Sequence, residues 1–232
     1  MHISGMPVDI PDEMISTLIR PEFDTLAPVE VFPGVPSHLD RTYAAVMGFR
    51  PLTMDLYIPA RPAARPVPVV VYAHPGGFFA GIEQMGPWRF LLEAGLAVVS
   101  VQYRLSGEAV FPAAVQDVAT AVRWVRVNAD RYGLDAARIV GFGSSAGAYL
   151  ISAVALAGDS SELVGGIEPY AKVSRRLAGV VEHYAPTDFL RHDQDAHLIA
   201  GGDHGSPHFN AAPLQQTTLE FLASVLVLPL HP

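Results

Sequence analysis

Residues 137–157 read ARIVGFGSSAGAYLISAVALA, a segment that predicts a strand, a tight turn and a helix in succession. It begins as a short apolar run typical of a buried strand, and it ends as an apolar segment typical of a helix packed beneath a sheet. Between them lies the pattern G-x-S-x-G, with Ser145 at its centre. A sharp strand-to-helix turn strains its central residue and exposes that side chain above the sheet. We therefore predict that Ser145 is a nucleophile and that Ser144 points away from the site.

The rest of the chain predicts more strands and helices in alternation. Strands are expected at 52–58, 69–74, 95–104 and 177–185, and a second helix at 112–130, where apolar residues recur at helical spacing. Alternation of Val-rich strands with helices is typical of an α/β fold with a mostly parallel sheet flanked by helices. The Pro-rich residues 1–50 are expected to form an N-terminal arm, with a lid as its candidate role. Residues 51–232 are then expected to form the α/β domain.

Composition excludes several classes of partner and chemistry. The chain has 232 residues, no cysteine and a formal net charge of −8. The negative charge argues against nucleic-acid or anionic-membrane partners, and the absence of cysteine excludes disulfides and thiolate chemistry. The N-terminal residues do not follow the pattern of a signal peptide, and no apolar run reaches the ~18 residues of a membrane span. We expect a cytoplasmic protein, and the sequence leaves its oligomeric state open.

A second glycine-rich segment, His74-Pro75-Gly76-Gly77-Phe78, follows the predicted strand at 69–74. Adjacent glycines let the backbone approach a substrate closely, and acyl transfer needs N–H donors aimed at the developing oxyanion. We predict that the N–H groups of Gly76 and Gly77 form an oxyanion hole. The N–H of Ala146, at the start of the helix after Ser145, is expected to join them.

Together these segments resemble the α/β-hydrolase fold, and in particular the hormone-sensitive-lipase-like and feruloyl-esterase-like serine carboxylesterases. The resemblance covers about residues 48–190, including LTMDLYIP at 52–59 and the stretch from 100 to 147 that leads into GFGSSAG. The family's oxyanion loop reads His-Gly-Gly-Gly followed by Trp or Phe. Here Pro75 replaces the first glycine and has no N–H to donate.

The family's triad follows the order Ser, acid, His. Its acid usually follows an apolar run that ends in Gly-Asp-x-Asp, and no such run follows residues 177–190. Instead AHLIAGGDHG at 196–205 resembles the family's last strand and histidine loop, and residues 214–228 resemble its closing helix. The resemblance thus implies His204 as the catalytic histidine and a fold shortened near the C-terminus, with one strand and one helix missing between Asp195 and Ala196. A frameshifted or truncated gene is the alternative account.

With the usual acid strand absent, we expect Asp188, in the stretch Ala-Pro-Thr-Asp, to orient His204. Competing carboxylates are Asp193, Asp195 and Asp203. Phe78 and Trp88, together with His74 of the oxyanion loop, are the candidate substrate contacts. A metal is not expected, because the His and Asp residues between 192 and 208 lack the helical spacing of a zinc hydrolase.

The expected function is cleavage of small carboxylic esters through an acyl-enzyme on Ser145, with no cofactor. Because the acid strand is missing, an alternative hypothesis is that the protein is a non-catalytic, ligand-binding or degenerate member of the fold. A third hypothesis is that the same pocket and triad catalyse cyclisation or lactone formation in a biosynthetic pathway. The sequence does not distinguish this activity from hydrolysis.

Overall fold

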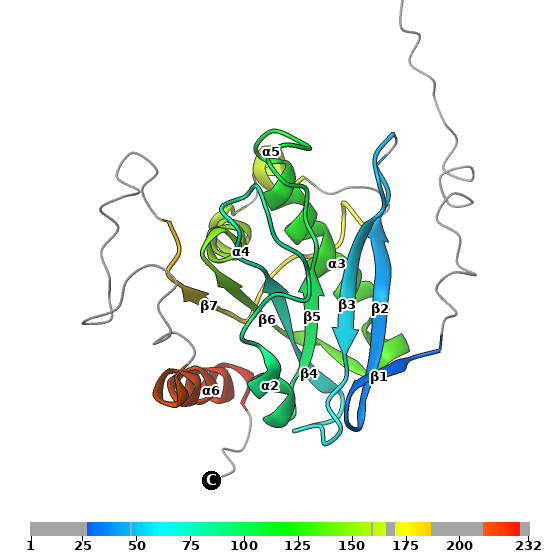
Figure 1. The fold of residues 1–232 in the computed structure, drawn as a ribbon, viewed down its shortest axis with the longest axis vertical. Coiled ribbons are helices and arrows are strands. Elements are labelled where there is room, and N and C mark those ends of the chain that lie inside the picture. Colours follow the sequence, from blue (N-terminus) through cyan, green and yellow to red (C-terminus); the bar gives the residue numbers. More distant parts are fainter. Residues whose placement is uncertain (1–26, 47, 159, 166–169, 187–210, 228–232) are drawn as a thin grey trace, which may run out of the picture.

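The computed structural model describes residues 27–46, 48–158, 160–165, 170–186 and 211–227. A seven-stranded sheet with the order β1-β2-β3-β5-β4-β6-β7 forms its centre (Figure 1). The strands are β1 Val29–Phe32, β2 Val35–Ala44, β3 Leu52–Tyr57, β4 Val67–Ala73, β5 Ala97–Val101, β6 Leu134–Ser144 and β7 Gly179–His183. The helices are α2 Arg89–Glu93, α3 Ala113–Tyr132, α4 Ala146–Leu156, α5 Ser161–Val164 and α6 Ala212–Leu226.

The sheet is mixed, and its parallel part carries the glycine-rich turns. Strands β5, β4, β6 and β7 pair in parallel, whereas β1, β2 and β3 pair antiparallel with their neighbours. The predicted α/β class is confirmed, and so are the strands expected at 52–58, 69–74, 95–104 and 177–185. All seven residues of β4 are buried, as the continuous Val-rich run indicated.

Residues 29–44 correct the expectation of an arm over the surface. They form β1 and β2 at one edge of the sheet, with Val29 opposite Ser37 and Arg41 opposite Met54. The sequence pattern does not predict this hairpin, because its polar and proline residues break the apolar alternation and because edge strands stay half-exposed. Residues 1–26, to which a lid role was also assigned, lie outside the described residues.

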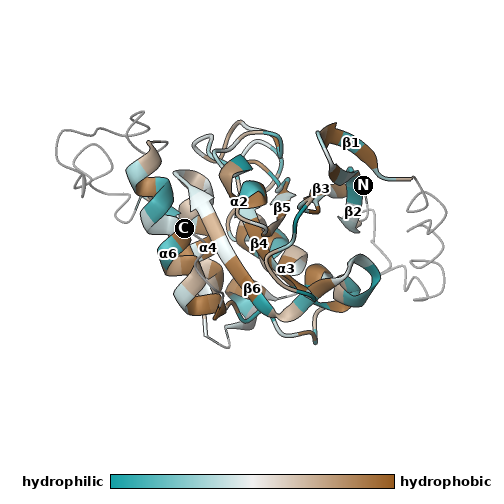
Figure 2. Cartoon of the chain, turned by 90° about the horizontal axis from the view of Figure 1, so that it is seen from below, coloured by the Kyte–Doolittle hydropathy of each residue, from teal (hydrophilic) through white to brown (hydrophobic). Residues whose placement is uncertain are grey.

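Alternate residues of the central strands face two separate hydrophobic clusters. Along β4, Val69 and Val71 pack with buried residues of α3 and α4, while Val70 and Tyr72 pack with residues of α2 and α6. This follows from the two-residue period of a strand, which sends successive side chains to opposite faces. In Figure 2 the apolar strands β4 and β6 accordingly run through the middle of the domain, with helices on both sides.

Residues with restricted or unusual backbone conformations mark both ends of the long helix α3. Pro112 precedes it, and Gly133 ends it in the left-handed conformation with φ 67°, which a side chain would disfavour. Within α3, Asp117 is fully buried and pairs with Arg104, whose Nη2 lies 2.6 Å from Oδ1. The same carboxylate accepts the Arg104 backbone N–H at 2.8 Å. Asp117 therefore fixes the chain after β5.

A cluster of three carboxylates lies at the joint between β2, β3 and the loop before α2. An oxygen from each of Asp40, Asp55 and Glu83 lies within 4.8 Å of the others. Asp55 is satisfied by the Asp40 N–H at 2.9 Å, the Tyr57 hydroxyl at 3.0 Å and the Gln84 amide at 2.8 Å. Glu83 is buried, and its Oε2 has no hydrogen-bond partner among the described residues. Burial, and then the charges of Asp55 and Asp40, raise the pKa of the Glu83 carboxyl.

We predict that Glu83→Gln stabilises the protein at neutral pH. The folded state binds the Glu83 proton more tightly than the unfolded chain does, so stability falls as pH rises through the raised pKa. The amide keeps the side chain's shape and removes the charge that burial penalises. Thermal unfolding at pH 7.5 is expected to show a Tm higher by a few degrees, and the gain should vanish as pH falls below the ordinary glutamate pKa.

The control for this prediction is Glu93→Gln, because that side chain is 71% exposed and makes only a surface contact with Arg89. Its Tm is expected to stay close to that of the parent protein. A Glu83→Gln protein no more stable than the parent at pH 7.5 would mean that the carboxylate cluster carries no electrostatic penalty.

Candidate active site

The turn between β6 and α4 has the geometry that G-x-S-x-G predicts. Ser145 adopts φ 51° and ψ −120°, a strained conformation for a residue with a side chain. Two hydrogen bonds hold it there: its N–H donates to the His183 carbonyl at 2.8 Å, and its carbonyl accepts the Tyr149 N–H at 3.1 Å. The two hydrogen bonds hold the serine in this strained conformation, between the end of the sheet and the first turn of α4.

The two glycines of the motif are required by close backbone contacts. A Cβ on Gly143 would lie 2.4 Å from the carbonyl carbon and oxygen of Gly147. A Cβ on Gly147 would lie 2.1 Å from the Ala73 carbonyl oxygen, at the end of the neighbouring strand β4. Because backbone atoms cannot move aside as flexible side chains do, a side chain at either position would push the turn away from β4.

The two adjacent serines occupy different environments. Ser144 is fully buried, and its Oγ accepts a hydrogen bond of 3.1 Å from the Tyr72 hydroxyl. Tyr72 belongs to the cluster packed with α2 and α6, so Ser144 faces the core on that side of the sheet. Ser145 retains 8% exposure. The expectation that Ser144 points away from the site agrees with this arrangement.

The loop after β4 lies beside the serine turn because β4 and β6 are adjacent and in register, with Ala73 opposite Gly143. Gly76 and Gly77 have φ 138° and 60°, conformations that glycine adopts without steric penalty. The Gly76 carbonyl accepts the N–H groups of Phe79 at 3.1 Å and Ala80 at 3.0 Å, which closes the loop into a tight turn. Ala146 is the first residue of α4, where the N–H has no acceptor within the helix. The candidate oxyanion donors thus come from two adjoining turns.

His74 supports the loop from below, which corrects its assignment as a substrate contact. Its ring is fully buried and stacks on Tyr103, with centroids 4.3 Å apart. His74 Nδ1 donates to the Pro75 carbonyl at 2.7 Å, and the Tyr103 hydroxyl donates to the His74 carbonyl at 2.9 Å. Burial lowers the pKa of His74, which favours the neutral ring that these contacts use.

Trp88 is also a core residue and not a substrate contact. It is 3% exposed and packs against Tyr57 and Phe32, with ring centroids 4.6 Å and 6.0 Å away. Its cluster is the one covered by α2 and α6. A tryptophan next to a predicted site is compatible with a core position or a pocket position, and the sequence alone did not distinguish them.

Phe78 lines a cavity, and its role as a substrate contact stays a prediction. This cavity has a volume of about 260 Å³ and is lined mainly by apolar side chains, among them Phe111, Tyr149 and Leu150. The Phe78 and Tyr149 rings meet edge to face at 5.7 Å. Tyr149 lies one helical turn after Ser145 and donates its N–H to the Ser145 carbonyl, so one residue of the cavity lining is bonded to the serine turn. Its spacing of four residues from Ser145 could have identified Tyr149 from the sequence. Phe111 reaches the cavity from a loop, and the sequence does not predict the path of that loop.

The other two members of the expected triad, His204 and Asp188, lie outside the described residues. His183, the last residue of β7, is near the serine turn because its carbonyl accepts the Ser145 N–H. Its ring is buried against Phe142, with centroids 4.8 Å apart, and burial lowers its pKa to about 4. A ring with so low a pKa is a weak base, so His183 is a poor match for the general base at neutral pH.

The chain matches the BD-FAE family over residues 54–222. Esterase LipI of Mycobacterium tuberculosis is 39% identical to it over 100 residues, which cover 42% of this chain and 31% of that protein. Carboxylesterase NlhH of the same species is 40% identical over 92 residues, covering 38% of this chain and 29% of that protein. The chain therefore spans about three tenths of the length of these curated relatives.

A solved structure of a truncated carbohydrate esterase from gut microbiota resembles the fold with a TM-score of 0.59 and 26% identity. It covers 70% of this chain and 60% of that chain. Among the described residues, no helix combines the length and the apolar character needed to cross a membrane. The family match over most of the chain, together with the sheet order and the serine turn, shows that the chain belongs to the BD-FAE family and has an α/β-hydrolase fold.

Proposed function

We propose that the protein is a serine hydrolase that cleaves small carboxylic esters through an acyl-enzyme on Ser145. The observation that carries this proposal is the strained Ser145, at φ 51°, beside the glycine turn of residues 76 and 77. Both turns follow the C-terminal ends of the paired strands β6 and β4. Strain of this kind, of order 1–3 kcal/mol, is kept in proteins chiefly where it positions a functional group. The esterase relatives support the same reaction class.

In the proposed reaction, Ser145 Oγ attacks the ester carbonyl carbon while its proton passes to His204. The carbonyl π-bond electrons move onto oxygen, and the N–H groups of Gly76, Gly77 and Ala146 stabilise that oxyanion. Collapse of the intermediate breaks the ester C–O bond, and His204 returns the proton to the leaving alcohol. Water then attacks the acyl-enzyme by the same route and releases the acid. Asp188 is assigned to orient His204, and both assignments rest on the family resemblance.

The cavity beside Phe78 supports a small, apolar group on the substrate. Its volume of about 260 Å³ lies just below the usual range for drug-sized ligands. Val110 and Phe111 are 85% and 64% exposed, so one wall of this apolar surface is open to water. Short-chain or aromatic esters are the substrates that fit this size and polarity.

The competing proposal is a non-catalytic, ligand-binding member of the family. The specific observation in its favour is the absence of a Gly-Asp-x-Asp segment between β7 and residue 204. A serine turn without its histidine and carboxylate would still form a pocket, but its Oγ would have no base to activate it. Covalent labelling separates the two proposals because it reports the reactivity of the serine itself.

We predict that an organophosphonate probe labels the folded protein at Ser145 and not at Ser144. Only Ser145 has access to the site, since Ser144 Oγ is buried and bonded to Tyr72. Peptide mass mapping with fragmentation between the two serines gives the position. Ser145→Ala should abolish labelling and lower turnover of a p-nitrophenyl ester by ~10⁴-fold or more. Ser144→Ala is the matched control and should still be labelled.

Labelling at Ser144, or no labelling of the folded protein, would rule out the hydrolase and favour the binding role. The fold would be unaffected by that result.

A second prediction concerns the oxyanion loop. Gly77→Val is expected to lower kcat by ~10²–10³-fold, the usual effect of losing one oxyanion donor. Gly77 has φ 60°, which a β-branched side chain disfavours, and a Cβ there would lie 2.5 Å from the Phe79 ring, so we expect the loop to change conformation and displace its N–H groups. Pro75→Gly should have a mild effect, because position 75 has no N–H to lose.

The control is Gly107→Val, since a Cβ at Gly107 meets no atom within 4 Å. Circular dichroism checks that both valine variants are folded. Full activity in a folded Gly77→Val protein would place the oxyanion hole elsewhere.

A further inference from the structure

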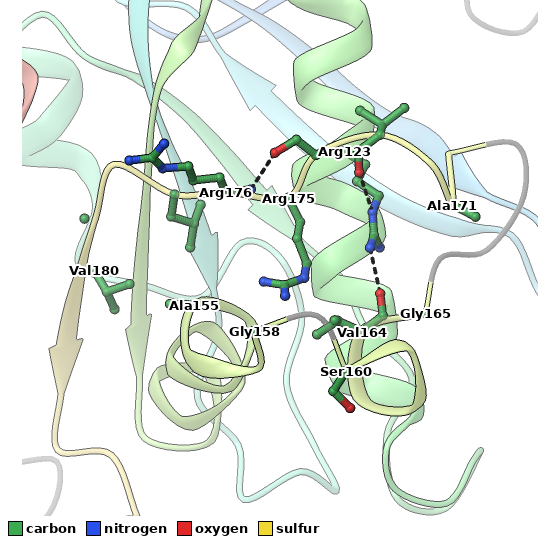
Figure 3. A pocket seen from close by; sticks show the side chains of 14 residues that line it. Arg123, Ala155, Gly158, Ser160, Val164, Gly165, Ala171, Arg175, Arg176 and Val180 are labelled. Atoms are coloured by element: carbon green, nitrogen blue, oxygen red, sulfur yellow. Dashed lines mark hydrogen bonds between the residues drawn. The ribbon is translucent and has the colours of Figure 1, made fainter.

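A second cavity, of about 610 Å³, lies where β7 begins. Its lining includes Gly179 and Val180 at the start of β7, Gly158 beyond the end of α4, and Val164 of α5 (Figure 3). Ser145, by contrast, follows the last residue of β6. The length of the strands therefore separates this cavity from the proposed active site, and no step of the proposed reaction uses it.

Three arginines line this cavity: Arg123 of α3, and Arg175 and Arg176 of the segment before β7. Among the described residues that line it there is no Asp or Glu, although acidic residues outnumber basic ones 23 to 15 in the whole chain. Figure 3 shows the guanidinium groups of Arg123 and Arg175 on the same side of the cavity, with that of Arg176 directed away from them. The described lining is therefore positively charged, whereas the chain as a whole carries a formal net charge of −8.

Arg123 is the central donor of this group. It is only 5% exposed, and it uses two nitrogens on the protein: Nε donates to the Val173 carbonyl at 2.9 Å and Nη2 to the Val164 carbonyl at 2.7 Å. Its Nη1 is buried and has no hydrogen-bond partner within the described part of the chain. A buried guanidinium donor without an acceptor is unfavourable unless a ligand supplies one.

Arg175 adds a second positive charge to the same place. Its Nη1 donates to the Val154 carbonyl at 2.5 Å, which holds the side chain over the end of α4. Burial, and then the positive charge of Arg175, lower the pKa of Arg123. Neither forms an ion pair with a carboxylate of the described residues.

We propose that this cavity binds a small oxyanion, a phosphate or carboxylate group of a metabolite-sized molecule, between Arg123 and Arg175. An oxygen of the ligand would accept from Arg123 Nη1, and its negative charge would offset the repulsion between the two arginines. Guanidinium groups suit this task because they stay charged and present several N–H donors to carboxylate and phosphate oxygens. The proposal stands independently of ester hydrolysis, because it involves neither Ser145 nor the loop of residues 74–80.

Calorimetric titration of the full chain with inorganic phosphate and, separately, with citrate tests this proposal at constant ionic strength set with NaCl. We expect one binding site for at least one of the two anions, and the preferred anion identifies the phosphate or carboxylate source. Arg175→Gln should weaken that binding by ~10-fold or more, the effect of losing a charged hydrogen bond. Arg175→Lys keeps the charge and should have an intermediate affinity.

Arg89→Gln is the matched control, since it removes the same charge from an arginine whose side chain is 65% exposed on α2. Its affinity should equal that of the parent protein. Arg175 carries the test because Arg123 also anchors two carbonyls and its replacement could unfold the segment. The inference is overturned if neither anion binds, or if the anion binds the parent, Arg175→Gln and Arg89→Gln proteins equally, which would indicate non-specific association.

Discussion

The parallel pairing of β4 with β6 is the constraint on which the candidate site depends. Ala73 lies opposite Gly143, so the chain leaves both strands at the same edge, once into the glycine loop and once into the serine turn. The contact between Gly147 and the end of β4 is so close that a Cβ would lie 2.1 Å from the Ala73 carbonyl oxygen. A shift of this register would separate Ser145 from the N–H groups proposed to serve it.

The surroundings of Ser145 over-determine its strained conformation. Its N–H and carbonyl are bonded to β7 and α4, each bond contributing about 0.5–1.5 kcal/mol, which together are comparable to strain of order 1–3 kcal/mol. Beneath the turn, Ser144 is bonded to Tyr72 in the core. On the neighbouring turn, His74 and Tyr103 stack and share a hydrogen bond. The strained serine is thus supported by rigid elements on both sides.

The sequence predicted the parts of the fold that have strong local signals. The Val-rich β4 and the glycines at 143 and 147 could be identified because continuous burial and close backbone contact each restrict residue type. The edge hairpin β1–β2 was missed because half-exposed strands tolerate polar residues and proline. Trp88 and His74 were assigned to substrate because residue type and position do not reveal burial, which depends on neighbours such as Tyr57 and Tyr103. His204 and Asp188 remain predictions.

The two cavities differ in the charge of their lining and in their position in the fold. The apolar cavity beside Phe78 is lined by Tyr149, which bonds to the serine turn, whereas the cavity of Arg123 and Arg175 lies where β7 begins. Strand β7 connects the two regions, because its last residue accepts the Ser145 N–H and its first residue lines the arginine cavity. An anion bound at the second cavity would therefore stabilise the folded state near a strand that also holds the serine turn.

The central claim is that Ser145 forms an acyl-enzyme, and trapping that intermediate tests it most directly. The protein is mixed with p-nitrophenyl butyrate, quenched in acid within the first turnover and analysed by mass spectrometry. We expect one butyryl group per chain, located on Ser145 by fragmentation of the peptide that contains both serines. Ester hydrolysis with no covalent adduct, or with the adduct on another residue, would contradict it.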